Sequence, residues 1–166
     1  MLADLAIPAF PVRRSDLEAE RVALIDTQPQ FRNNRFDKRR RPAIVIDHHP
    51  HHGQARADLL LIEEDVGATT TLMAEALLLS GVPVPRGLAT AIVYGSGAET
   101  QNLGRDAGPR DRAAYLAFMP KADLKLLWRI ANPPRTASFF QTIARGISNA
   151  FVCRRIIGVH LREVFS

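Results

Sequence analysis

Two short apolar runs in the first third of the chain each end in an aspartate. They are Arg21-Val-Ala-Leu-Ile-Asp26 and Ala43-Ile-Val-Ile-Asp47. Apolar runs of this length are typical of strands buried in a parallel sheet. The carboxyl ends of parallel strands meet at one edge of the sheet, and ligands bind at that edge. The sequence therefore predicts that Asp26 and Asp47 lie at the same edge, on separate strands.

The rest of the chain alternates between helical and apolar patterns. We expect first a short helical remnant over 1–6, then the two strands above and a third strand over 58–62. A helix over 67–80 stopped by Gly81 and a helix over 87–94 ending at Gly95 should follow. After them we expect a helix opened by Pro109 and interrupted by Pro120, a segment ended by Asn132-Pro133-Pro134, an amphipathic helix around 139–147 and a last strand over 151–159. Strands that alternate with helices predict an α/β fold with a doubly wound, mostly parallel sheet and helices on both faces.

Composition narrows the class of protein. With 166 residues, 46% of them hydrophobic and 23% charged, the chain is expected to form one soluble domain over residues 1–166. The net charge of +5 is compatible with an anionic partner such as RNA, DNA or a nucleotide. Cys153 is the only cysteine, so a disulfide framework is excluded. No apolar run approaches the roughly 20 residues that span a bilayer, and no signal peptide is evident, so a cytoplasmic location is expected.

The segment Asp47-His48-His49-Pro50 concentrates metal-binding groups after a strand. Carboxylate oxygen and neutral imidazole nitrogen suit Mn²⁺, Mg²⁺ or a similar divalent ion. Such ions neutralise phosphate charge and activate water. A polar turn would explain the Asp-His-His tripeptide by itself, but Asp26 ends the neighbouring strand in the same way. The two strand ends together favour a metal site.

Several segments resemble the motifs of the DHH family of phosphoesterases, in collinear order along the chain. Ile44 to Pro50 resembles the signature that names the family, and Ala23-Leu-Ile-Asp-Thr-Gln-Pro29 resembles its second motif. Further resemblances are found in Gly67-Ala-Thr-Thr-Thr71, which opens the following helix, in Ala91 to Arg105, which is similar to the fourth motif, and in Val159 to Val164, which is similar to the linker before the C-terminal substrate-binding domain. The most similar branch is the bacterial oligoribonuclease and 3′-phosphoadenosine 5′-phosphate phosphatase type.

The resemblance implies roles for six residues. Asp26, His48 and Glu99 would be metal ligands, and a complete family member would hold two ions, Mn²⁺ or Mg²⁺. His49 would contact the scissile phosphate, and Asp47 would orient His48 or touch the metal. Arg105 would contact substrate phosphate, although a solvated loop arginine is an equally good interpretation.

Two features depart from the family pattern. No segment within residues 1–25 matches the first motif, a histidine-containing loop with an Asp-x-Asp pair, and the C-terminal substrate domain is also missing. The chain is therefore interpreted as a catalytic domain truncated at its first motif. Glu99 stands where the family has aspartate, and its extra methylene displaces the carboxylate by about 1.5 Å. We expect Gly95-Ser96-Gly97 to give the loop the freedom to compensate.

The implied function is hydrolysis of short oligonucleotides or phosphorylated nucleotides by metal-activated water. A first alternative is a degenerate, non-catalytic module that binds metal or nucleotide. A second alternative is an inorganic pyrophosphatase-like activity. Self-association into a homo-oligomer is expected if the strands lack a neighbour, because an uncovered apolar edge pairs with other chains.

A basic loop lies between the two acidic strand ends. Lys38 to Arg41, with Arg32 and Arg35, could steer a polyanion towards the site, although a charged surface loop would look the same. Phe31 and Phe36 could stack on bases, but we expect them to pack under the loop. His51 and His52 could extend the metal site, and solvation is the favoured interpretation. We expect the three aromatic residues Trp128, Phe139 and Phe140 in the core.

Overall fold

The computed structural model describes residues 4, 5, 7–51, 53 and 55–161. The chain divides into two compact units, Met1–Ala131 and Asn132–Ser166. Most of the helix expected over 1–6 lies outside the described residues, as does half of the linker entry expected over 159–164. None of the helices in the described ranges is long and apolar enough to cross a membrane.

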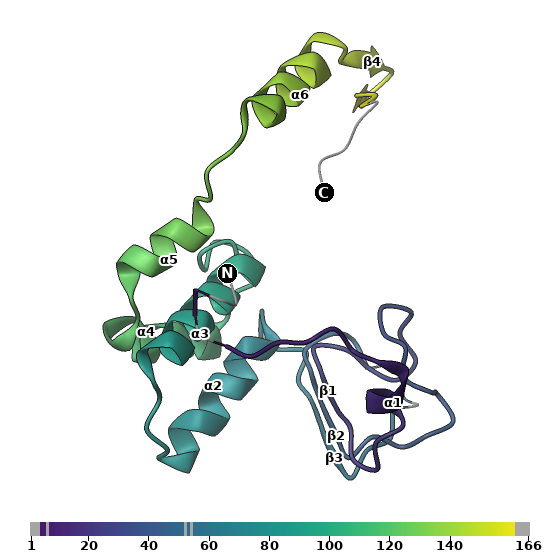
Figure 1. Cartoon of the computed structure of the whole chain (residues 1–166), viewed down its shortest axis with the longest axis vertical. Helices are drawn as coiled ribbons and strands as arrows, with labels where there is room; N and C mark the ends of the chain where they lie inside the picture. Colours follow the sequence, from purple (N-terminus) through teal and green to yellow (C-terminus); the bar gives the residue numbers. More distant parts are fainter. Residues whose placement is uncertain (1–3, 6, 52, 54, 162–166) are drawn as a thin grey trace. The chain divides into compact units, whose positions relative to one another are not determined.

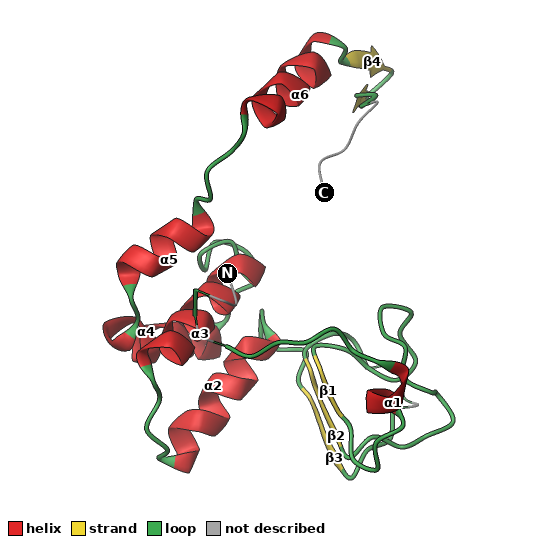
Figure 2. Cartoon of the chain, in the orientation of Figure 1, coloured by secondary structure: helices red, strands yellow, loops and turns green. Residues whose placement is uncertain are grey.

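The first unit is built on a three-stranded parallel sheet (Figure 2). Its strands are β1 (Ala23–Ile25), β2 (Ile44–Asp47) and β3 (Leu59–Ile62), in the order β1-β2-β3. Ile25 pairs with Ile46, and Asp47 pairs with Ile62, so the carboxyl ends of all three strands lie together. The expected parallel α/β architecture is confirmed, and each observed strand is shorter than the predicted one by at least one residue.

Four helices follow the sheet in this unit. They are α2 (Thr69–Ser80), α3 (Arg86–Glu99), α4 (Pro109–Phe118) and α5 (Leu124–Ala131), and a 3₁₀ turn at Met119–Lys121 separates the last two. Figure 1 shows α2, α3 and α4 gathered on one side of the strands, with the short α1 (Arg14–Leu17) on the other. Gly81 ends α2 at a positive φ of 66°, and Pro109 begins α4, as the sequence predicts.

Two apolar clusters hold this unit together. The first lies among α2, α3 and α4 and contains Ala74, Ile92, Val93 and Phe118. The second lies under the sheet, where buried side chains of β1 and β2 meet Phe36 from the basic loop. Phe36 therefore packs beneath its loop, as expected.

Helix α3 is longer than the sequence predicts. Gly95, expected to end it, lies inside the helix, which continues to Glu99. A Cβ atom at Gly95 would lie 2.8 Å from Thr70 Oγ1, so the glycine allows α2 and α3 to approach closely. The predicted flexible segment around Glu99 is therefore wrong. Glycine here serves helix packing, and Glu99 is carried by the last turn of a helix.

Trp128 also departs from expectation. It lies on α5, and 66% of its surface is exposed, so it is not the core residue that the sequence predicts.

The second unit contains one helix and one hairpin. Helix α6 (Ala137–Ser148) begins where Thr136 Oγ1 accepts the Phe139 N–H. Antiparallel strands β4 (Phe151–Cys153) and β5 (Ile156–Gly158) follow. The single strand expected over 151–159 is wrong because Arg154, with a φ of 56°, reverses the chain in a two-residue turn. Phe140, which we expected in the core, is 60% exposed.

Candidate metal centre

Asp26 follows the end of β1 and turns its carboxylate towards the start of α2. Its backbone adopts a φ of 61°, while its N–H donates to the carbonyl of Ile46. The Thr69 hydroxyl, at the first position of α2, donates to Asp26 Oδ1 over 2.7 Å. About half of the Asp26 side chain remains exposed. The carboxylate is therefore oriented by one hydrogen bond and still accessible to a ligand.

His48 lies opposite Asp26. Its Nδ1 is 3.3 Å from the carbonyl oxygen of Val66, so Nδ1 carries the proton in this contact. That tautomer leaves Nε2 with a free lone pair, 3.6 Å from Asp26 Oδ1. A backbone carbonyl that fixes a histidine tautomer in this way is typical of metal-binding histidines.

Asp47 is completely buried beneath the two histidines. Its Oδ1 accepts the Nδ1–H of His49 over 2.8 Å and the backbone N–H of His48 over 2.9 Å. Gln28 Nε2 donates to Oδ2 over 2.9 Å. Burial by itself would raise the pKa of Asp47, but the hydrogen bonds from His49 and Gln28 outweigh it and lower the pKa. Asp47 thus supports the ring of His49 and also accepts the backbone N–H of His48, and its expected role of orienting His48 or touching the metal stays a prediction.

His49 completes the cluster. Its hydrogen bond to Asp47 raises its pKa against the opposing effect of burial, and the charges of Asp26 and Glu99 contribute in the same direction. Its Nδ1 lies 4.0 Å from Asp26 Oδ1. The Phe31 ring meets the imidazole edge to face, with 5.9 Å between ring centroids. With Nδ1 engaged by Asp47, Nε2 is the nitrogen that remains for a ligand or substrate.

These three residues could hold a divalent cation. Asp26, His48 and His49 each offer one ligand atom, and those atoms lie within 4.8 Å of one another. One carboxylate oxygen with imidazole nitrogen is a donor set suited to Mn²⁺, Zn²⁺ or Fe²⁺, and Mg²⁺ would need further oxygen ligands. The oriented oxygen of Asp26 and the tautomer of His48 both fit such an ion.

Glu99 faces the same region from α3. A cleft of about 380 Å³ is lined by both Asp26 and Glu99, together with Thr69, Thr70 and Gly95. Arg105 donates from its guanidinium to the carbonyl of Glu99 over 3.0 Å and pairs with Asp106 at 3.5 Å. The structure therefore places Glu99 at the cleft, and it places Arg105 against the backbone that carries Glu99.

Sequence reasoning missed the residues that support the ligands. Gln28 lies within a recognised motif, but its contact with Asp47 has no local signal. Asp111 is a fully buried carboxylate on α4 that accepts hydrogen bonds from Gly67, 44 residues away in the chain. A first-turn aspartate suggests only a helix cap, so the longer contact could not be predicted.

His51, which follows the signature, does not join the cluster. The backbone N–H of His51, an exposed residue, donates to Glu64 over 2.7 Å. His52, the other histidine expected near the site, lies outside the described residues.

The basic loop is tied to the segment that resembles the second motif, Ala23 to Pro29. Asn34 Nδ2 donates to the carbonyl of Gln28 and to the Thr27 hydroxyl. Three of its cations bind the protein itself: Lys38 contacts the Gln30 carbonyl, Arg40 the carbonyls of Leu17 and Ala19, and Arg41 pairs with Asp58. The other three, Arg32, Arg35 and Arg39, are exposed.

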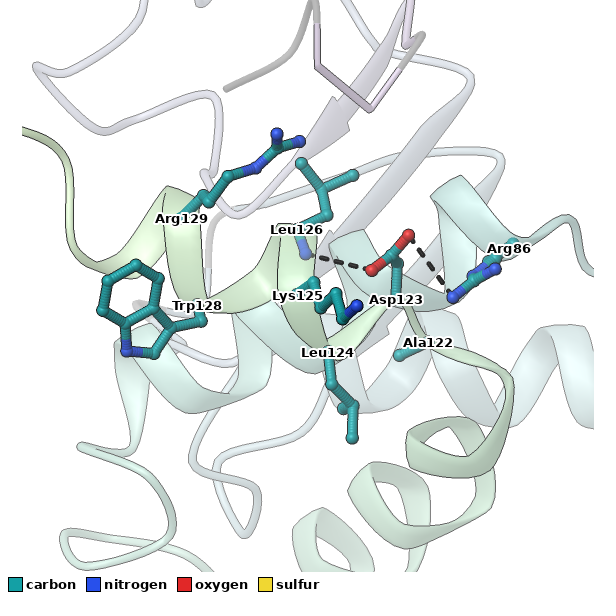
Figure 3. Close-up of a pocket in the computed structure, with 8 residues that line it drawn as sticks. All are labelled: Arg86, Ala122, Asp123, Leu124, Lys125, Leu126, Trp128 and Arg129. Carbon is teal, nitrogen blue, oxygen red and sulfur yellow. Dashed lines mark hydrogen bonds and ion pairs between the residues drawn. The ribbon is translucent and has the colours of Figure 1, made fainter.

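A larger cavity, of about 930 Å³, lies around the start of α5. Figure 3 shows that Asp123 there bonds the Leu126 N–H and pairs with Arg86, while Trp128 and Arg129 leave α5 in different directions. Its charged groups do not converge on a common point. The smaller cleft at Asp26 is the better candidate site because Asp26 also belongs to the cluster with His48 and His49, whose ligand atoms lie within 4.8 Å of one another.

Comparison with known proteins supports this fold. No protein-family model matches the chain. The chain is 27% identical over 114 residues to an uncharacterized protein of Methanocaldococcus jannaschii, covering 69% of this chain and 23% of that protein. It is also similar to the crystal structure of an exopolyphosphatase-related protein from Bacteroides fragilis, with a TM-score of 0.64 and 18% identity over 83% of this chain. The likeness establishes the fold. The chain spans 43% of that structure's chain and less than a quarter of the archaeal protein.

Proposed function

We propose that this chain is a divalent-metal-dependent phosphoesterase domain of the DHH type. The observation that carries the proposal is the pairing of Asp26 Oδ1 with His48 Nε2, 3.6 Å apart, at the carboxyl edge of a parallel sheet. The fold of an exopolyphosphatase-related protein supports the same class of chemistry. So does the resemblance of the strand ends to the family's motifs.

The side chains divide the work between metal and substrate. Asp26 and His48 hold the ion, and Glu99 faces the same cleft from α3. When bound, Mn²⁺ or Mg²⁺ supplies activation of water and neutralisation of phosphate charge. Asp47 keeps the His49 ring in place through Nδ1, which leaves Nε2 to contact the scissile phosphate. A protonated His49 would donate a hydrogen bond from Nε2 to an anionic phosphate, and the hydrogen bond to Asp47, which raises the pKa of His49, stabilises that form.

The substrate we favour is a short oligonucleotide or a phosphorylated nucleotide. Residues 27–41 contain six basic residues and one acidic residue, a net +5 that equals the charge of the whole chain. This loop meets the site directly, because Phe31 contacts His49. A positive loop attracts an extended anion, and an aromatic ring beside the phosphate site can stack on a base.

Hydrolysis assays with Mn²⁺ test the function. We expect the chain to cleave a 5′-phosphorylated dinucleotide, His48→Ala to lose this activity, and His51→Ala, which alters an exposed histidine outside the cluster, to retain it. Binding of the dinucleotide without cleavage would support the non-catalytic module, and cleavage of pyrophosphate alone would support the pyrophosphatase-like alternative. Equal activity in His48→Ala and the unaltered chain would contradict the proposal.

The loop gives a second test, on substrate length. In the double variant Arg32→Ser/Arg35→Ser, KM for a phosphorylated trinucleotide should rise several-fold, because phosphate contacts supply much of the affinity for a polyanion. KM for bis(p-nitrophenyl) phosphate should stay constant, and Arg112→Ser, at an exposed arginine of α4, is the control.

A separate Phe31→Ala variant should weaken trinucleotide binding while inorganic polyphosphate binding is unchanged. If the KM for the trinucleotide is the same in the loop variants and in the unaltered chain, the basic loop does not take part in substrate binding.

A further inference from the structure

The turn between β3 and α2 touches both candidate metal ligands. Its Val66 carbonyl accepts from His48 Nδ1, and its Thr69 hydroxyl donates to Asp26 Oδ1. The Val66 contact is made to the ring nitrogen opposite His48 Nε2, and the Thr69 contact is made to Asp26 Oδ1 itself, the oxygen that faces His48. Because such outer hydrogen bonds orient the ligands, the position of residues 66–69 sets the relative position of His48 Nε2 and Asp26 Oδ1.

Asp111 anchors this turn from α4. Its carboxylate accepts the N–H of Gly67 at 3.0 and 2.9 Å through its two oxygens, and the hydroxyl of Thr71 at 2.5 Å. It also accepts the N–H of Gly108, which caps its own helix. Asp111 and Thr71 are both fully buried. A buried carboxylate with this many donors is held rigidly, because each donor would lose its partner if the carboxylate moved.

Close packing at Gly67 links the same turn to the segment that follows Glu99. A Cβ atom at Gly67 would lie 2.5 Å from the Asp106 carbonyl oxygen and 2.9 Å from Thr100 Cγ2. The turn therefore has no room to shift in that direction. The three segments that carry Asp26, His48 and Glu99 all meet it.

We propose that Asp111 is a positioning residue of the metal centre. It fixes the turn at residues 66–69, and through Thr69 and Val66 it holds Asp26 and His48 at metal-binding separation. The inference rests on the proposed function in one respect, since it takes Asp26 and His48 as metal ligands. Asp111 itself touches neither the metal nor the substrate.

The test compares two aspartates that both cap helices. Asp111→Asn removes the anchor of the turn and the cap of α4. Asp123→Asn removes the cap of α5, where Asp123 accepts the Leu126 N–H, and the ion pair with Arg86, but it leaves the turn at residues 66–69 untouched. In titration calorimetry on the full chain, Mn²⁺ affinity should fall on the order of 10-fold in Asp111→Asn, as for other outer partners of metal ligands, and stay constant in Asp123→Asn. The electron paramagnetic resonance spectrum of bound Mn²⁺ should change only in Asp111→Asn.

A readout without metal separates this inference from the proposed function. By NMR, Asp111→Asn should shift the amide signals of Asp26 and His48 and speed amide exchange at Gly67, whose N–H binds Asp111, while Asp123→Asn should leave all three unchanged. If the unaltered chain binds no Mn²⁺, the proposed function fails and the NMR result still decides on the anchor. If the unaltered chain and Asp111→Asn bind Mn²⁺ equally and their amide signals coincide, Asp111 does not position the metal ligands, and the proposed function is not affected.

A milder variant guards against loss of the fold. Thr71→Val removes one donor to Asp111 and keeps the shape of the side chain. It should move Mn²⁺ affinity and the amide signals in the same direction as Asp111→Asn, by a smaller amount. If Asp111→Asn does not fold, unchanged affinity and unchanged signals in Thr71→Val would overturn the inference.

Discussion

Asp26 and His48 could be predicted as neighbours because each follows a strand of the same parallel sheet. The parallel order of the strands predicts the sheet edge at which each side chain lies, and in the structure Asp26 Oδ1 is 3.6 Å from His48 Nε2. It does not fix which partners orient a side chain. Thr69 and Asp111 reach the site through tertiary contacts, and no local pattern of residues encodes such contacts. Asp47 illustrates the same limit, since the structure pairs it with the ring of His49.

The buried carboxylate of Asp47 gives a prediction at this scale. In Asp47→Asn, the amide cannot accept all the hydrogen bonds that Gln28 and the two histidines donate, so the free energy of unfolding should fall by about 1–3 kcal/mol. The pKa of His49, which Asp47 raises, should fall towards the ordinary value. Urea unfolding and NMR titration measure the two effects, with the exposed Asp58→Asn as control. A His49 pKa that is equal with and without the Asp47 carboxylate would contradict the assigned contact.

Among the elements, α2, α3 and α4 depend on contacts that their sequences hide. Gly95 looks like a helix stop, but it lies inside α3 because the Thr70 side chain occupies the space that a Cβ atom would need. The spacing of apolar residues predicts that a helix is present. It does not predict where the helix ends when a glycine inside it serves packing. The hairpin at 151–158 was missed for a related reason, since Arg154 reverses the chain without glycine, asparagine or proline to mark the turn.

An ion pair between helices gives a prediction on pH. Arg110 of α4 binds Glu75 of α2 through two hydrogen bonds, of 2.9 and 2.7 Å, and these lower the pKa of Glu75. Because folding lowers the pKa of Glu75, its ionised form stabilises the folded state at pH values above the ordinary glutamate pKa of about 4.3. This stabilisation is lost as the pH falls through the lower folded-state pKa. Glu75→Gln should therefore cost up to about 1 kcal/mol at pH 7, since the pair is partly exposed, and progressively less below about pH 4.3.

Thermal unfolding across pH measures this difference. Glu18→Gln is the control, because Glu18 pairs with Arg14 in a more exposed position. A stability loss in Glu75→Gln that stays constant from pH 7 down to pH 3 would show that the charge of Glu75 is not its cause.

At the scale of the molecule, the sequence predicts one domain and the structure has two compact units, Met1–Ala131 and Asn132–Ser166. All candidate metal ligands lie in the first unit. The parallel order of its strands could be predicted because apolar strands ending in carboxylates alternate with helices. The division of the chain into two units could not be predicted, because Asn132-Pro133-Pro134 is equally typical of a helix end within a single domain.

Metal binding by the first unit is the claim on which the proposed function depends. Titration calorimetry with Mn²⁺ on the full chain, on Asp26→Asn and on His48→Ala tests it most directly, with His51→Ala as the matched control. We expect the unaltered chain and His51→Ala to bind Mn²⁺ with equal affinity, and each ligand variant to lose at least 10-fold. Equal Mn²⁺ affinity in all four proteins would contradict the assignment of Asp26 and His48 as metal ligands.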